Sequence, residues 1–225
     1  MQTPLGSTLR WSGPSLWLVA AVSAAVVSTD LAFLATDRLT VWRGYVLAAI
    51  VVVMVGALAT YRRDGASFGL RLSPLQGWAY WAKAAILLGL VLLLILSAAY
   101  GIVVGLQGYS IPARYYYVSS ATPLWPLFVW MCVKAPLVEE VVYRLAVCPP
   151  VAAWLGPPGA IAVSGLLFAA AHVLGGNAAP DNLLAGFILA WAFLKSGTIA
   201  VPIALHSLGN VCAFAFQTVH FYWCA

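Results

Sequence analysis

Two adjacent carboxylates, Glu139 and Glu140, are the only glutamates in this chain of 225 residues. They lie in an apolar stretch, where an ionisable side chain costs about 2.5–3.5 kcal/mol on insertion scales, and such residues usually mark function. Residues four apart share a helix face, so Glu140 can pair with Arg144. Glu139 is turned by about 100° from its neighbour and cannot use the same geometry. The spacing therefore leaves Glu139 available as a general base.

The other polar groups expected at membrane depth are two imidazoles and one amide. His206 and Asn210 are four residues apart and lie on one helix face. Phe168 and His172 repeat this spacing, which packs the aromatic ring beside the imidazole. Peptide hydrolysis requires a base to activate water and donors for the oxyanion that develops. A carboxylate, two imidazoles and an amide can supply both.

The composition indicates that membrane helices position these groups. Hydrophobic residues make up 64% of the chain and charged residues 8%, against about 45–50% and about 25% in soluble domains. A soluble domain is excluded. At about 20 residues per span, the length accommodates roughly six to eight helices. We therefore predict an all-α, polytopic transmembrane bundle of about seven helices, forming one membrane-embedded domain over residues 1–225, with spans at 15–36, 44–60, 78–106, 124–148, 158–174, 181–196 and 198–219.

The third predicted span is longer than a bilayer core of about 30 Å, so it must tilt, protrude or break near Gly101. The basic residues flank the apolar runs and read as topology signals, not as a nucleic-acid surface. An N-terminus in the cytoplasm puts one group of them inside, namely Arg10, Arg62, Arg63, Arg71 and Lys195, and another outside, namely Arg38, Arg43 and Arg114. Asp30 is interpreted as a packing or capping residue that could also line a cavity, and Lys134 as a side chain that snorkels or neutralises a carboxylate.

Three short motifs follow one another in the last part of the chain. They are EExxxR at Glu139-Glu140-Val-Val-Tyr-Arg144, FxxxH at Phe168-Ala-Ala-Ala-His172, and HxxxN at His206-Ser-Leu-Gly-Asn210. In this order they resemble the CPBP family of intramembrane proteases, also called the Abi or CAAX protease family, which includes type II CAAX prenyl endopeptidases. The resemblance covers residues 124–219, which we expect to form the protease core.

The resemblance implies that Glu139 and His172 activate water, that His206 and Asn210 form the oxyanion hole, and that Glu140 and Arg144 support them. The family has been described both as metalloproteases and as metal-independent glutamate proteases. We favour the mechanism without a cofactor. Two histidines and a carboxylate could still complete a zinc site, in which case the ligands would be Glu139, His172 and His206.

The resulting hypothesis is an intramembrane endopeptidase in a bacterial cytoplasmic membrane. Its partners would be membrane lipid and a membrane-tethered protein or peptide, cleaved in a hydrophobic or C-terminal sorting segment, and nucleic acid is not expected. One alternative is a catalytically silent scaffold or bacteriocin-immunity protein of the same fold. Another is a proton- or ion-coupled transporter, which is disfavoured because the polar residues form one cluster and no inverted repeat is apparent.

Overall fold

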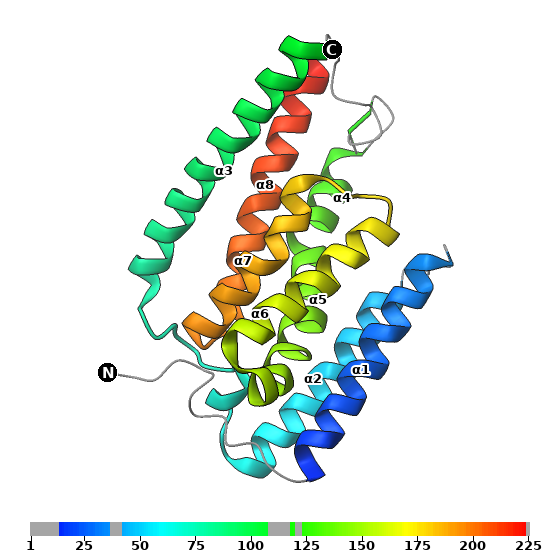
Figure 1. Ribbon diagram of the computed structural model, residues 1–225, viewed down its shortest axis with the longest axis vertical. Coiled ribbons are helices and arrows are strands. Elements are labelled where there is room, and N and C mark those ends of the chain that lie inside the picture. Colours follow the sequence, from blue (N-terminus) through cyan, green and yellow to red (C-terminus); the bar gives the residue numbers. More distant parts are fainter. Residues whose placement is uncertain (1–13, 37–41, 108–117, 120–122, 224–225) are drawn as a thin grey trace.

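A computed structural model describes residues 14–36, 42–107, 118–119 and 123–223, and these form a bundle of helices (Figure 1). Apart from helices, the described residues contain one isolated bridge between Leu70 and Thr198. The α-helices are α1 (Pro14–Ala35), α2 (Arg43–Arg62), α3 (Trp78–Gln107), α4 (Leu124–Val129), α5 (Ala135–Glu140), α6 (Cys148–Leu174), α7 (Pro180–Ser196) and α8 (Ala200–Trp223). A 3-10 turn, η1 (Ala66–Phe68), and two π-helical segments, η3 (Trp130–Lys134) and η4 (Val141–Leu145), complete the set.

The helical bundle predicted from composition is confirmed, and five of the described helices are long and apolar enough to cross a membrane. The fourth predicted span is a composite of α4, η3, α5 and η4. It ends at Leu145, three residues earlier than expected, and the prolines that follow begin α6. The fifth predicted span is the longer part of α6, after a kink at Gly156, whose φ of 70° and ψ of 177° are not helical.

The third predicted span is one continuous helix, α3, of 30 residues. At about 1.5 Å per residue it is about 45 Å long. Of the three alternatives for this span, a break near Gly101 is the one that does not occur, which leaves a tilt or a protrusion from the bilayer core. In Figure 1, α3 runs along the edge of the bundle, and it contacts α8. Its described apolar side chains are mostly exposed, as expected for a helix with hydrocarbon on most sides.

The centre of the bundle is formed by α6 and α7, which pack against each other. On one side, α1 lies against α6, and α2 lies against α1 and η4. On the other side, α8 lies against α7 and η3. The composite helix 124–145 is therefore enclosed between α2 and α8, so its two glutamates face inward instead of toward lipid.

A loop clasp fixes the start of α8. The loop 63–77 bonds to the turn between α7 and α8: the Gly69 carbonyl accepts the Ile199 N–H at 2.8 Å, and the Ser196 carbonyl accepts the Leu75 N–H at 2.9 Å. Thr198 adds a hydroxyl bond to the Arg71 carbonyl at 2.7 Å. Because His206 lies seven residues after Ile199 on α8, the clasp helps to set the position of its imidazole.

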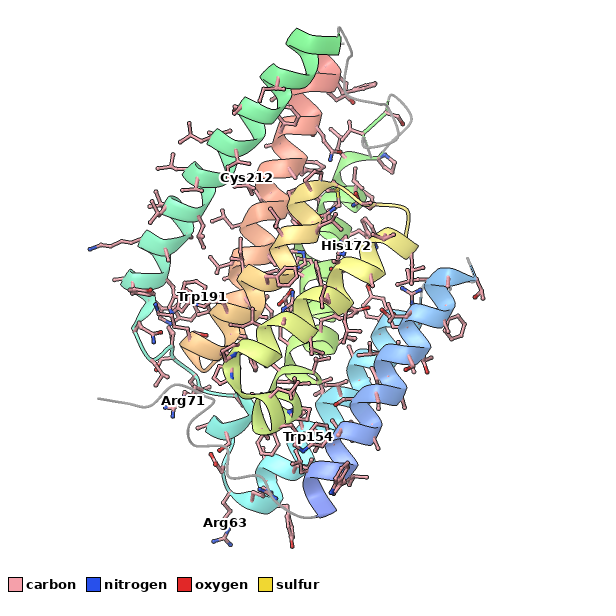
Figure 2. All side chains as sticks on the ribbon, in the orientation of Figure 1. Arg63, Arg71, Trp154, His172, Trp191 and Cys212 are labelled. Atoms are coloured by element: carbon pink, nitrogen blue, oxygen red, sulfur yellow. The ribbon has the colours of Figure 1, made fainter. Side chains whose placement is uncertain are left out.

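Figure 2 shows Arg63 and Arg71 at the end of the molecule where α2 finishes. Lys195, in the last turn of α7, belongs to the same end, since the Gln76 side chain donates to its carbonyl at 2.8 Å. Arg43 begins α2 and lies at its opposite end. This separation agrees with the two predicted groups of basic residues. Arg10, Arg38 and Arg114 lie outside the described residues.

Candidate active site

The two glutamates lie at the end of α5, a six-residue α-helical segment between two π-helical ones. Each π turn holds one residue more than an α turn, and such turns occur frequently at functional sites. They change the direction in which the following side chains point. Glu140 is fully buried, whereas the side chain of Glu139 is 31% exposed. The adjacent carboxylates therefore lie in different surroundings.

Glu140 forms the ion pair that its spacing predicts. Its Oε2 lies 2.9 Å from Nε of Arg144, and neither side chain is exposed. Arg144 Nη1 also donates to the Ser164 hydroxyl of α6 at 3.0 Å, and Ser164 donates in turn to the Tyr143 carbonyl at 2.7 Å. A buried charge is tolerated when it is paired and its remaining donors are bonded. This network ties the composite helix to α6.

His206 adds a contact that the spacing could not indicate. Its Nδ1 lies 2.9 Å from Oε1 of Glu140. Because a carboxylate oxygen only accepts, His206 donates from Nδ1, which fixes the tautomer of the neutral ring and the direction of Nε2. Glu140 therefore bonds both Arg144 and His206, where sequence reasoning assigned it to Arg144 alone.

Glu139 is the carboxylate without a fixed partner. Its Oε2 is buried and accepts no hydrogen bond from the described residues. The nearest ionic partner is Nε2 of His206 at 3.9 Å, which is too long for a direct hydrogen bond. Glu139 also lies within electrostatic range of His172. The Glu139 carboxylate thus lies near the imidazoles of His206 and His172 and keeps one oxygen free of hydrogen bonds from the described residues.

His172 is held by its own helix and by an aromatic ring. Its Nδ1 lies 3.0 Å from the Phe168 carbonyl, so Nδ1 is the donor and Nε2 keeps its lone pair in the neutral ring. The Phe168 ring packs beside His172 as predicted, with centroids 4.4 Å apart. The same ring contacts His206 edge-on at 5.9 Å and the Arg144 guanidinium at 4.6 Å. Phe168 is therefore a common wall for both imidazoles.

Asn210 lies one turn beyond His206 on α8. Its Nδ2 donates to the Met131 carbonyl of η3 at 2.7 Å. An amide nitrogen carries two hydrogens, so one N–H remains after this bond. The structure thus joins Glu140, Arg144 and His206 in one bonded network. It places Glu139 3.9 Å from His206 and sets His172 against the Phe168 ring that His206 also contacts, while Asn210 is bonded to the backbone of η3.

A second buried network reaches the site from the N-terminal helices. Tyr143 donates to Oδ2 of Asp30 on α1 at 2.6 Å, and Asp30 Oδ1 lies 3.1 Å from Nε of Arg43 on α2. The Tyr143 ring meets Phe168 edge-on at 5.6 Å. Of the two interpretations of Asp30, packing is the one that its contacts match. Lys134 is exposed and forms no ion pair with the described carboxylates.

Sequence reasoning missed Ser164 and Tyr143. A lone serine in an apolar helix is a weak signal, and the tyrosine lies at a variable position of EExxxR.

The three side chains named as zinc ligands from sequence, Glu139, His172 and His206, are suitable donors for zinc by their chemistry. As arranged within the described residues, no three His, Cys, Asp or Glu side chains converge on one ion position. The described side chains as arranged therefore do not fit a metal ion.

Comparison with protein families shows that residues 120–212 match the family described as type II CAAX prenyl endopeptidase Rce1-like. The match covers less than half of the chain and includes all three motifs. It confirms the resemblance to the CAAX protease family drawn from those motifs. The family and the apolar helices together identify an integral membrane protein. No curated protein and no solved structure matches the chain.

Proposed function

We propose that this chain, whose residues 120–212 match the Rce1-like family, is an intramembrane endopeptidase with Glu139 as its base. The observation that carries the proposal is the buried Oε2 of Glu139, which has no hydrogen-bond partner among the described residues and lies 3.9 Å from the nearest imidazole nitrogen. A carboxylate oxygen that is buried without a hydrogen-bond partner is costly unless it binds substrate or water.

In the proposed mechanism, Glu139 and His172 bind and deprotonate the attacking water. The Phe168 carbonyl holds the Nδ1 proton of His172, so the lone pair on Nε2 can accept a hydrogen bond from water. Glu139 takes the proton as the oxygen attacks the scissile carbonyl and later returns it to the leaving amine. The two groups share the work: His172 orients the water, and Glu139 carries the proton.

His206 and Asn210 stabilise the negative oxygen that develops on the scissile carbonyl. When the His206 ring is protonated, both of its nitrogens donate, and the Glu140 carboxylate at 2.9 Å stabilises that charge. Nε2 and the second N–H of Asn210 are then the two donors. Preorganised donors in a water-poor site are worth about 10²–10³ in kcat each. Glu140 and Arg144 are supporting residues, because they reach the reaction only through His206.

The substrate class we propose is a membrane-associated segment, hydrophobic or C-terminal. The family description names a CAAX prenyl endopeptidase, and a prenyl or hydrophobic tail would bring a peptide substrate into the bilayer, where membrane lipid surrounds the site. We further propose a bacterial cytoplasmic membrane with the N-terminus and the end carrying Arg63 and Arg71 in the cytoplasm. The protease core is residues 124–219.

The test uses purified protein in phospholipid vesicles, with a farnesylated peptide ending in Cys-aliphatic-aliphatic-X and a non-prenylated hydrophobic peptide as probes. Cleavage is followed by mass spectrometry. Glu139→Gln keeps the shape and removes the base, and we expect kcat to fall by about 10²–10⁴. Asp181→Asn, a matched change in the first turn of α7, serves as the control. Retained turnover in folded Glu139→Gln protein would remove Glu139 as the base, and a wild-type chain that cleaves neither probe would favour the silent scaffold.

A further inference from the structure

The bond between Asn210 and Met131 has a cause in the backbone of η3. In an α-helix each carbonyl accepts the N–H four residues later, whereas in a π turn it accepts the N–H five residues later. In η3 the Trp130 carbonyl accepts the Ala135 N–H, five residues on. The next bond in this register would join the Met131 carbonyl to the N–H of residue 136. Residue 136 is a proline and has no N–H.

The Met131 carbonyl is therefore left without a main-chain donor, because Ala135 is already used and Pro136 has none to give. A backbone carbonyl without a partner is costly in the bilayer, and side chains of neighbouring helices commonly satisfy carbonyls that a proline has released. Asn210 does so here from α8, at 2.7 Å.

The same arrangement recurs at the other end of the composite helix. The Ala146 carbonyl would take the N–H of residue 150 in α-helical register, and that residue is also a proline. It accepts instead the hydroxyl of Ser23 on α1 at 2.7 Å. Two carbonyls released by prolines thus anchor the segment that carries the glutamates. The Met131 carbonyl binds it to α8, and the Ala146 carbonyl binds it to α1. The repetition indicates that the Asn210 contact is a consequence of Pro136.

We propose that Pro136 is a positioning residue for Asn210, acting through the Met131 carbonyl that it leaves free. This inference rests on the proposed function, in which the second N–H of Asn210 meets the oxyanion. The amide group is planar, so a bond from one N–H fixes the direction of the other. The same bond holds α8 so that His206, one turn earlier, meets Glu140. Pro136→Ala supplies a competing N–H, which releases Asn210.

The sequence permits a direct measurement of this hydrogen bond. Met131–Cys132 is the only Met-Cys pair in the chain, so carbonyl-¹³C methionine combined with ¹⁵N cysteine isolates one carbonyl signal in NMR spectra of the whole protein. We expect Asn210→Leu to shift this signal as the bond is lost. In the Pro136→Ala background the same replacement should shift it much less, because the backbone N–H has already taken the place of the amide. An unchanged signal in Asn210→Leu, or equal shifts in both backgrounds, would overturn the inference.

Pro126 provides the matched control. It lies in the first turn of α4 (Leu124–Val129), where an N–H has no partner within the helix. Pro126→Ala should therefore leave the Met131 signal and the effect of Asn210→Leu unchanged. If Pro136→Ala does not fold, Asn210→Leu in the natural background still decides whether the Met131 carbonyl depends on Asn210.

Turnover of the farnesylated probe gives the functional part of the test. Pro136→Ala should lower kcat, by up to about 100-fold as for a misplaced catalytic group, with KM little changed. The losses in Pro136→Ala and Asn210→Leu should not multiply, since both remove the same oriented N–H. Multiplying losses would contradict the positioning role. A wild-type protein without turnover would count against the proposed function, while the carbonyl signal would still test the hydrogen bond.

Discussion

The imidazole of His206 and the carboxylate of Glu140, 66 residues apart in the chain, are joined by a hydrogen bond of 2.9 Å. This bond separates the roles of the two adjacent glutamates. Glu140 holds an arginine and a histidine at once, as the orienting carboxylate of a hydrolytic triad holds its histidine. Glu139 is left with an oxygen that no described residue bonds.

Glu140→Gln should damage stability and turnover together. The change removes the charge that Arg144 faces at 2.9 Å, and both side chains are fully buried. Breaking one partner of a buried ion pair costs about 3–5 kcal/mol, so the thermal unfolding midpoint in detergent should fall clearly. Arg144→Met and Glu140→Gln combined should recover part of the loss. A single Glu140→Gln change that leaves the midpoint unaltered would show that the pair is not a structural support.

Phe168→Leu should lower both stability and activity, because the Phe168 side chain is buried in the core. The ring contacts His172, His206 and the Arg144 guanidinium, and each aromatic contact is worth about 0.5–1.5 kcal/mol. Phe214→Leu is the matched control, because its edge contact with Phe128 at 5.5 Å lies on a different part of α8. We expect a lower unfolding midpoint and a lower kcat in Phe168→Leu, and little change of kcat in Phe214→Leu, which is only partly buried. Equal activity in the two variants would mean that Phe168 only fills space.

Tyr143→Phe should loosen the N-terminal helices. It removes the 2.6 Å hydrogen bond to Asp30, which then keeps only its ion pair with Arg43. Hydrogen bonds to charged groups contribute about 1.5–3 kcal/mol, and the loss should appear as faster hydrogen exchange in α1. Tyr61→Phe, at an exposed position, should change nothing. Exchange rates that do not differ between the two variants would exclude a structural role for this contact.

Exhaustive chelation distinguishes the two chemistries described for the family. If Glu139 acts as a glutamate base without metal, protein treated with a strong chelator should keep its turnover, and its metal content by atomic emission should be far below one ion per chain. Loss of turnover that zinc alone restores would support the alternative, with Glu139, His172 and His206 as ligands. In that case Glu139→Gln, His172→Ala and His206→Ala should each release the zinc.

The parts of this structure that the sequence predicts are local ones. The spacing of Glu140 and Arg144, and of Phe168 and His172, determines both contacts because the helix period alone brings these residues together. The span boundaries follow from apolar runs. The bond from His206 to Glu140 could not be predicted, since it depends on how α8 is rotated against α5.

The π-helical segments could not be predicted from the sequence either. Over five residues, the hydrophobic pattern of a π-helix can hardly be distinguished from that of an α-helix. The side chains that bind the carbonyls released by prolines could be predicted in part. Each interior proline requires its upstream carbonyl to find a donor, and Ser23 and Asn210 are among the few polar residues on the helices that face them. What sequence reasoning lacked was the order in which the helices pack.

The π turn of η3 has a consequence for insertions and deletions. The turn takes one residue more than an α turn over nearly the same rotation, so removing one residue from 130–134 would return it to α-helical register and leave the direction of α5 nearly unchanged. A return to α-helical register at the present length would instead rotate α5 relative to α4 by about 100°, the angle that separates neighbouring residues. Glu139 would then take the direction now held by Glu140, and Val138 the direction now held by Glu139. The two carboxylates thus keep their separate surroundings only while the turn accommodates its extra residue, and the same motif letters in an uninterrupted α-helix of equal length would put the wrong carboxylate in the site.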